Sequence, residues 1–295
     1  MQTVSIIGVG RIGGALALAL DAENNQIENL IVREKEKAEI IRGKLKSKPR
    51  IFNLADAEKI ESKIIFICTQ DTEIGNVAEI LRAKLKGNPF VFHTSGALSS
   101  EILNELKKIG CRTGSIHPLV SVSDSSRGAE NFRGAFFCVE GENEAVEIAE
   151  KIVADVGGES FSIATEYKTL YHAAAVTACG HLIARLDAAF QMMEKCGLGD
   201  VQAKRILLPL IKSTIENLEQ QTPAAALTGT FARADAETFA RHLETLEKNV
   251  EPEILELYLL LGLRSLPLAK KQGAKAENLN RIQKELLLAK KNLKC

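Results

Sequence analysis

No two cysteines in this sequence follow the C-x-x-C spacing, although six cysteines are present. Scattered single cysteines argue against zinc sites and disulfide frameworks and fit a reducing cytosol. The formal net charge is zero, so neither a nucleic-acid-binding surface nor a disordered chain is expected. The sequence therefore predicts an ordinary globular protein that has no metal site and does not bind nucleic acid.

The sequence also lacks a long uncharged run and a basic leader. Its longest stretch without a charged residue, at positions 169–184, contains two histidines and is slightly short for a membrane span. Met1 leads directly into an apolar segment, which argues against a signal peptide. We expect a soluble, cytoplasmic protein with no membrane partner.

The N-terminal half of the chain alternates short apolar runs with segments of helical spacing. This alternation predicts a doubly wound α/β domain, in which crossover helices connect the strands of a parallel sheet. Strands are expected at residues 3–7, 30–32, 63–67, 89–93, 113–116, 135–139 and 160–162.

Beyond Thr165 the β pattern stops and the chain continues in long segments of helical period. A chain of 295 residues is long for a single core, so we expect two domains, at residues 1–164 and 165–295. The second domain is expected to be entirely helical. Its helices are expected at residues 166–196, 200–220, 234–249, 253–272 and 276–292.

Residues 8–13 match the pattern G-x-G-x-x-G between the first strand and an Ala/Leu-rich helix. In dinucleotide-binding Rossmann domains the first glycine allows a tight turn, the second lets the pyrophosphate approach the backbone, and the third permits close helix packing. The helix N-terminus then faces the phosphates. A glycine turn without a ligand is the alternative. We predict a Rossmann domain that binds its cofactor at Gly8, Gly10, Arg11, Ile12 and Gly13.

The end of the second strand bears on the choice of cofactor. NAD-binding domains usually carry an acid about twenty residues beyond the glycines, where it binds the ribose 2′-hydroxyl. Here the strand is followed by Arg33 and then Glu34, with Lys35 and Lys37 on the next turn. Arg33 suits a 2′-phosphate, because its planar donors match a phosphate group. NADP(H) is predicted, and NAD(H) stays open because Glu34 could serve as the ribose acid.

Polar residues follow two later strands. Cys68 and Thr69 come after one strand, and Ser95 comes after the next. In an open parallel sheet the ligand lies beyond the carboxyl ends of the strands, so these residues are expected to border the cofactor. Helix capping is an equally good explanation for Asp71, Ser95 and Ser99.

Hydride transfer also needs a group that gives or takes a proton. Lys168 and His172 are four residues apart and share one face of a predicted helix. His172 is the preferred proton donor, because the start of this helix should adjoin the sheet, whereas His181 faces the opposite way. His117, which precedes Pro118 after a strand, is the third candidate. The alternatives are a core histidine, a solvated lysine and a histidine that braces a turn.

Five stretches carry recognisable motifs: residues 8–13, 93–97, 115–119, 171–175 and 227–235. Together they resemble a known family of two-domain, Rossmann-like predicted short-subunit dehydrogenases, whose helical C-terminal half is a domain of unknown function. The resemblance covers nearly the whole chain and implies NAD(P) binding. More distantly, the layout is similar to pyrroline-5-carboxylate reductases and to 3-hydroxyisobutyrate, 6-phosphogluconate and prephenate dehydrogenases.

Two further expectations concern the helical half. Arg233 and Asp235 lie in a loop, where Arg233 could bind a substrate carboxylate; a mutual salt bridge with capping by Asp235 is the alternative. Residues 254–263 are apolar nearly all round and need burial, so we expect a homodimer formed by this half.

The combined prediction is an NADP(H)-dependent oxidoreductase that acts on a small carbonyl, imine or hydroxy-acid substrate by hydride transfer. A deazaflavin-dependent NADP oxidoreductase is one alternative. The other is a catalytically silent NADP-binding sensor, since Gly180 stands where the resembled family usually has an asparagine.

Overall fold

The computed structural model describes residues 2–23 and 25–293, which form two compact units, Met1–Ala178 and Cys179–Cys295. The division falls later than the predicted boundary at 164/165. Helix α7 (Lys168–Ala178) belongs to the first unit, because Lys168 is buried there and donates a hydrogen bond to Ser115 Oγ at 2.7 Å. The first unit therefore contains all three residues predicted to be catalytic.

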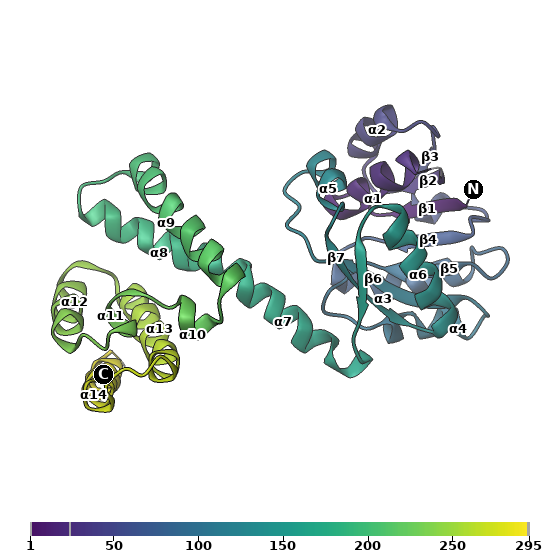
Figure 1. Cartoon of the computed structure of the whole chain (residues 1–295). Coiled ribbons are helices and arrows are strands. Elements are labelled where there is room, and N and C mark those ends of the chain that lie inside the picture. Colours follow the sequence, from purple (N-terminus) through teal and green to yellow (C-terminus); the bar gives the residue numbers. More distant parts are fainter. Residues whose placement is uncertain (1, 24, 294–295) are drawn as a thin grey trace. The chain divides into compact units, whose positions relative to one another are not determined.

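The first unit is built on one eight-stranded sheet of order β3-β2-β1-β4-β5-β6-β7-β8 (Figure 1). All neighbouring strands are parallel except β6 and β7, which are antiparallel. The predicted doubly wound α/β class is confirmed. The strands are β1 (Thr3–Ile7), β2 (Gln26–Ile31), β3 (Arg50–Phe52), β4 (Ile64–Ile67), β5 (Phe90–His93), β6 (Arg112–Pro118), β7 (Phe136–Gly141) and β8 (Glu159–Ser162).

Two features of the sheet depart from the sequence prediction. Strand β3 was not expected, because it has only three residues and none of them is fully buried. The reversed direction of β7 was not expected either, since hydrophobic periodicity reports a strand and one buried face but not a direction. The loop after β3 matters below, because it lines a pocket of about 550 Å³.

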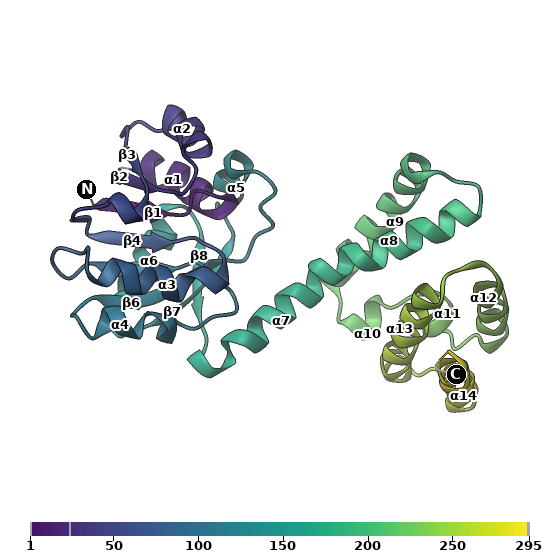
Figure 2. The same ribbon diagram turned by 180° about the vertical axis from the view of Figure 1, so that it is seen from behind.

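Helices cover both faces of the sheet, and each face has its own core. Ile6 and Phe66 pack on one face with α1, α2 and α6, whereas Ile7 and Ile67 pack on the other with α3 and α4. Figures 1 and 2 show α6 on one side of the sheet and α3 on the other. The helices are α1 (Arg11–Ala22), α2 (Lys35–Lys44), η1 (Leu54–Asp56), α3 (Asp71–Arg82), η2 (Ser100–Leu103), α4 (Asn104–Lys107), α5 (Ser125–Asn131), α6 (Asn143–Asp155) and η3 (Thr165–Tyr167).

The described part of the second unit is helical, as predicted. Its apolar core joins α11 to α14 around Phe239, Leu259 and Ile282. Leu259 was predicted to lie in a dimer seam; it is instead fully buried in this core, while its neighbour Leu260 is half-exposed. The helices are α8 (Gly180–Lys195), α9 (Asp200–Gln220), α10 (Pro223–Ala226), α11 (Gly229–Ala232), α12 (Ala236–Asn249), α13 (Pro252–Lys271) and α14 (Ala276–Asn292).

The first long helix of the prediction, residues 166–196, is interrupted at Cys179, between α7 and α8. The stretch Thr165–Lys195 is long and apolar enough to cross a membrane by length and composition alone. Its first turns, however, carry the buried Lys168 and the hydrogen-bonded Tyr171, both held against the sheet. The absence of a membrane partner stays a prediction.

Candidate functional site

The glycine turn between β1 and α1 has the geometry that a bound pyrophosphate requires. Gly8 has a φ of +88°, and a Cβ atom there would lie 2.9 Å from the Cys68 carbonyl. A Cβ on Gly13 would overlap the carbonyl oxygen of Gly8, so α1 can approach the turn only with glycine at this position. At Gly10 a Cβ would meet nothing within 4 Å. The turn is therefore tightly packed at Gly8 and Gly13 and open at Gly10, where phosphate oxygens would approach the backbone.

The start of α1 leaves room for an anion. Gly10 is its N-cap residue, no side chain caps the helix, and its first turn contains no acidic residue. Unpaired N–H groups and the helix dipole make such an N-terminus a favourable anion site. Arg11 and Ile12, predicted to contact the cofactor, are the first two residues of this helix.

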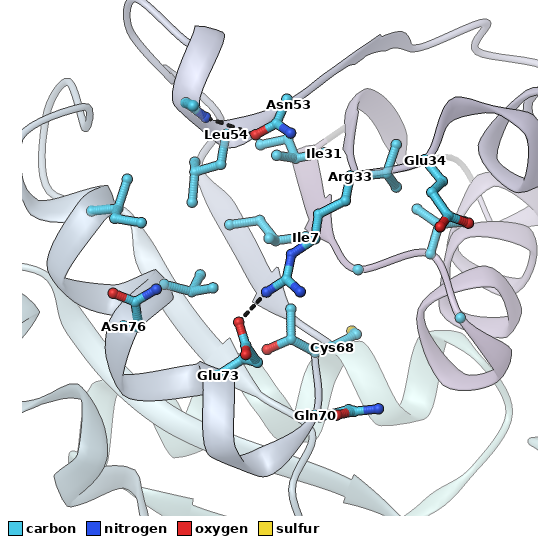
Figure 3. Close-up of a pocket in the computed structure, with 18 of the residues that line it drawn as sticks. Ile7, Ile31, Arg33, Glu34, Asn53, Leu54, Cys68, Gln70, Glu73 and Asn76 are labelled. Atoms are coloured by element: carbon cyan, nitrogen blue, oxygen red, sulfur yellow. Dashed lines mark hydrogen bonds and ion pairs between the residues drawn. The ribbon is translucent and has the colours of Figure 1, made fainter.

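A pocket of about 550 Å³ opens beside this turn (Figure 3). Thr69 lies in its wall, and the buried hydroxyl oxygen of this residue has no hydrogen-bond partner among the described residues. An unpaired buried hydroxyl is costly, so it marks a place where a ligand would complete the hydrogen bonding. The polar residues that line the pocket are Arg33, Glu34, Lys37, Asn53, Thr69, Gln70, Glu73 and Asn76.

An ion pair spans this pocket. Figure 3 shows the guanidinium of Arg33, after β2, reaching across to the carboxylate of Glu73 on α3. The side chain of Arg33 is 75% exposed and that of Glu73 is 33% exposed, so the pair is open to solvent. Glu34 lies on the other side of Arg33 in the same view. Arg33 thus lines the pocket and pairs with Glu73, a partner that the sequence analysis did not identify; its contact with a cofactor phosphate stays a prediction.

Sequence reasoning missed several pocket residues for identifiable reasons. Asn53 follows β3, which was itself missed. Glu73 and Asn76 lie within α3 and show no motif; their spacing of three residues was the available signal, because it places them on one face of the helix. Ser95, predicted to border the cofactor, is not among the pocket residues.

Ser95 and Cys68 have local structural roles. The Ser95 hydroxyl accepts hydrogen bonds from the backbone N–H groups of Ala97 and Leu98, at 3.1 and 3.0 Å. These bonds brace the bend at residues 96–98 and not a helix start, because η2 begins at Ser100 with Ser99 as its N-cap residue, so the helix-capping alternative is wrong for Ser95. Burial raises the pKa of the Cys68 thiol to about 12, so this side chain is a neutral thiol at physiological pH.

A second group of polar side chains lies on β6 and β7. Ser115 and His117 are two residues apart on β6 and so face the same side of the sheet. They pair in register with Glu140 and Cys138 of β7. Lys168 of α7 is 1% exposed; its Nζ donates to Ser115 Oγ at 2.7 Å and lies 3.7 Å from Cys138 Sγ.

The predicted residues His117 and His172 meet in this group. Their ring centroids are 5.8 Å apart, and Tyr171 Oη lies 2.8 Å from His117 Nδ1. The loop after β5 approaches both imidazoles at Gly96, where a Cβ would lie 2.7 Å from His117 Nε2 and would overlap the His172 ring. The structure thus brings all three predicted catalytic residues to one region. Tyr171 and Gly96 are additional members that the prediction did not assign.

Burial and basic neighbours set the protonation of this region. Burial lowers the pKa of His117 to about 4, and the nearby charges of Lys168 and His172 act in the same direction. Burial also lowers the pKa of Lys168 and raises the pKa of the Tyr171 phenol. At neutral pH, His117 is therefore a neutral imidazole and Tyr171 a protonated phenol.

His93, at the end of β5, is fully buried and has both ring nitrogens paired. Its Nε2 lies 3.1 Å from the Ser99 carbonyl oxygen, and its Nδ1 accepts the Ser95 backbone N–H at 3.2 Å. Burial lowers the pKa of His93 to about 4. This histidine braces the loop that carries Gly96.

Arg233 and Asp235 lie in the second unit, beside a shallow pocket that Arg281 also lines. Asp235 caps α12 by accepting the backbone N–H of Thr238 at 3.0 Å, and this bond holds the pKa of the carboxyl below its usual range. No ion pair joins Arg233 to Asp235. The capping alternative is therefore correct for Asp235, whereas the mutual salt bridge is wrong.

No group of three or more His, Cys, Asp or Glu residues is arranged to hold a metal ion in residues 2–23 and 25–293.

Comparisons with known proteins agree with this architecture. A model of the Rossmann-like domain matches residues 1–118, and a model of a domain of unknown function, DUF2520, matches residues 135–265. The chain therefore carries a Rossmann-like domain followed by a DUF2520 domain. No curated protein matches the sequence. The name short-subunit dehydrogenase stays a prediction.

Solved structures share the fold over nearly the whole chain. A Bacteroides fragilis protein assigned as an NADP oxidoreductase has a TM-score of 0.75 at 21% identity, over 90% of this chain and 98% of that one. A Thermotoga maritima protein has a TM-score of 0.71 at 24% identity, over 91% and 99%. A Plasmodium falciparum pyrroline carboxylate reductase with NADP bound has a TM-score of 0.52 at 15% identity, over 98% and 97%. Structural neighbours thus include NADP oxidoreductases, and at these identities the likeness is one of fold.

Proposed function

We propose that this chain is an NADP(H)-dependent oxidoreductase that reduces a small carbonyl or imine compound, or oxidises the corresponding product. The observation that carries the proposal is the open glycine turn at Gly8 and Gly10, which adjoins a pocket containing the unpaired hydroxyl of Thr69. These residues fit a dinucleotide, with the pyrophosphate at the start of α1 and the adenosine end in the pocket. Arg33 and Lys37 would face the 2′-phosphate there, and Glu34 leaves NAD(H) as the second cofactor.

NADP(H), when bound, supplies or accepts the hydride. The protein must bind the substrate, orient it and move one proton. We assign the proton to His172 and substrate orientation to His117, because their rings lie together beside the loop after β5. The side chain of Lys168 is 1% exposed, so it cannot contact a substrate without movement. We therefore assign Lys168 a supporting role, through its hydrogen bond to Ser115.

Titration with NADPH and NADH tests the cofactor assignment. Arg33→Ala is expected to weaken NADPH binding by about tenfold to a hundredfold, because a charge-assisted hydrogen bond contributes roughly 1.5–3 kcal/mol. NADH binding should change little. Arg281→Ala, which removes an exposed arginine of the second unit, is the matched control. Equal affinities for the two cofactors in the wild type would contradict the preference and would favour Glu34 as a ribose ligand.

Turnover separates an enzyme from a sensor. NADPH oxidation should be followed with a panel of 2-oxo acids, ketones and cyclic imines. Tight NADPH binding without turnover on any member would favour the silent sensor, whereas turnover only with a deazaflavin would favour a redox partner.

We also propose that the chain forms a homodimer through α8 and α9. In these helices only Ala188 and Ala203 are buried, whereas Ile183, Val201 and Leu210 are 67%, 84% and 62% exposed. Helices gain most of their stability by burying an apolar face, so this pair needs a partner. Binding of a substrate carboxylate by Arg233, a cytoplasmic location and the lack of a nucleic-acid partner remain predictions.

A further inference from the structure

The hydrogen bond between Tyr171 and His117 has a defined direction. The Tyr171 phenol is protonated at neutral pH, because burial raises its pKa. Among the described residues, its hydroxyl has no hydrogen-bond partner other than His117 Nδ1, at 2.8 Å. Donation by the phenol pairs its O–H with Nδ1, whereas the reverse direction would leave both the phenol O–H and the Nε2 lone pair without a partner among the described residues. The geometry therefore favours the phenol as donor and Nδ1 as acceptor.

This direction fixes the tautomer of His117. A neutral imidazole carries one N–H, so an accepting Nδ1 places the proton on Nε2. Nε2 is the ring nitrogen that faces Gly96, and no described residue forms a hydrogen bond with it. His117 therefore presents an unpaired N–H donor at the point where the loop after β5 comes closest.

The surroundings of this donor are basic. His172 lies beside it, and Lys168 Nζ lies 5.9 Å from the centre of the Tyr171 ring. The buried carboxylate of the region, Glu140, is already occupied: it accepts hydrogen bonds from Ser100 N at 2.7 Å, Ser100 Oγ at 2.8 Å and Thr165 Oγ1 at 3.3 Å. The unpaired group at the site is therefore a donor, and the acceptor atoms of Glu140 are already hydrogen-bonded, although its carboxylate keeps its charge beside Lys168.

We propose that Tyr171 is a positioning residue that holds His117 as an Nε2–H donor, and that the site takes a substrate oxygen, the carbonyl of a ketone or 2-oxo acid, rather than a protonated imine. The substrate class rests on the proposed function. A carbonyl oxygen accepts the N–H, and a neighbouring carboxylate is attracted by the basic groups. A protonated imine brings its own N–H donor and no acceptor, so it would leave the N–H of His117 unpaired.

The tautomer can be measured on the protein alone. Nitrogen-15 NMR of histidine ring atoms distinguishes protonated from unprotonated nitrogens, and His117→Gln identifies the signals of His117. The wild type should show an unprotonated Nδ1. Tyr171→Phe should convert His117 to a mixture of tautomers, whereas Tyr167→Phe, which alters a 57% exposed tyrosine on the preceding turn, should not. A protonated Nδ1 in the wild type, or an unchanged tautomer in Tyr171→Phe, would overturn the assignment.

Two unreactive probes test the substrate class in the presence of NADPH. Oxamate has the shape and charge of a 2-oxo acid, and pyrrolidinium has those of a protonated cyclic imine. Oxamate should bind more tightly than pyrrolidinium, should shift the His117 Nε2 signal, and should bind about tenfold more weakly to His117→Gln. Tighter binding of pyrrolidinium, binding of neither probe, or oxamate binding that ignores His117→Gln would overturn the substrate class. If NADPH itself fails to bind, the proposed function and the substrate class fail together, while the tautomer result still stands.

Discussion

A histidine–tyrosine hydrogen bond of almost the same length occurs in each unit of the molecule. In the first unit, His117 Nδ1 lies 2.8 Å from Tyr171 Oη; in the second, His242 Nδ1 lies 2.9 Å from Tyr258 Oη. Both pairs of rings are T-shaped. Both tyrosines also contact phenylalanine rings, Tyr258 those of Phe231 and Phe239 and Tyr171 that of Phe161, but only the first pair faces a second histidine. The same hydrogen bond can therefore brace helices or orient a donor, and its neighbours decide which.

The wider contrast between the units explains this difference. Among the described residues, every fully buried polar side chain belongs to the first unit, including His93, Glu140 and Lys168. Buried polar groups are costly, and clusters of them with shifted pKa values mark functional sites. The second unit instead leaves large apolar side chains exposed on α8 and α9. We infer that the first unit carries the chemistry and that the second provides an interaction surface.

The largest expected effect is a loss of folding stability when a core leucine of the second unit is truncated, compared with truncation of an exposed leucine. Leu259→Ala should lower the free energy of unfolding by about 3 kcal/mol, because it opens a cavity at a fully buried position. Leu288→Ala, at a position on α14 that is 61% exposed and lies outside the proposed interface, should change it by less than about 0.5 kcal/mol. Urea denaturation followed by circular dichroism measures both.

Leu210, an exposed residue of α9, tests the dimer. Leu210→Glu should dissociate the dimer in sedimentation experiments without lowering the melting temperature of the subunit, because a charge would enter an apolar interface. A wild type that sediments as a monomer would contradict the homodimer. A stable dimer in Leu210→Glu would place the interface elsewhere.

The next prediction compares histidines of the two units in catalysis. His172→Ala should lower turnover of a reducible substrate by about a hundredfold or more, because it removes the proposed proton donor. NADPH affinity should stay unchanged, since the glycine turn is untouched. His181→Ala and His242→Ala, both in the second unit, should leave turnover within about twofold of the wild type. Normal turnover in His172→Ala would transfer the role to His117.

The sequence predicted those parts of the site that depend on residues close together in the chain. The glycine pattern is local, so Gly8, Gly10 and Gly13 were predicted along with their geometry. The i, i+4 spacing of Lys168 and His172 was local too, and it correctly placed both near the sheet.

The contacts that complete the site were not predictable in the same way. The partner of Arg33 is forty residues away on another helix, and the partner of His117 is fifty-four residues away. Pairings of that kind depend on strand order and on how α7 meets the sheet, which no local pattern in one sequence encodes. The burial of Leu259 was missed for the same reason, since a segment that is apolar all round does not show which partner covers it.

The next prediction concerns how the free energy of unfolding depends on pH through the buried His93. The pKa of His93 is about 4 in the folded protein, below its ordinary value, so the unfolded chain binds the proton first as the pH falls. The stability that neutral His93 contributes is complete above about pH 6.5 and is lost toward pH 4. Between pH 7.5 and 5, this loss should be about 2 kcal/mol in urea denaturation. His93→Gln should remove this part of the slope and leave the part that His117 contributes, because the pKa of His117 is also about 4. His242→Gln should keep the wild-type slope; equal slopes in all three proteins would contradict the assignment.

The smallest expected effect concerns the ion pair across the pocket. Arg33 must leave Glu73 to face a 2′-phosphate, and the carboxylate would repel that phosphate. Glu73→Gln keeps the size of the side chain and removes its charge, so NADPH affinity should rise about threefold, while NADH affinity should change less. The gain should shrink at high ionic strength, because the groups are exposed. Glu79→Gln is the matched control, since Glu79 lies on the same helix and pairs with Arg82. Weaker NADPH binding in Glu73→Gln would show instead that Glu73 holds part of the cofactor, and Arg33 would then no longer be the residue that distinguishes the two cofactors.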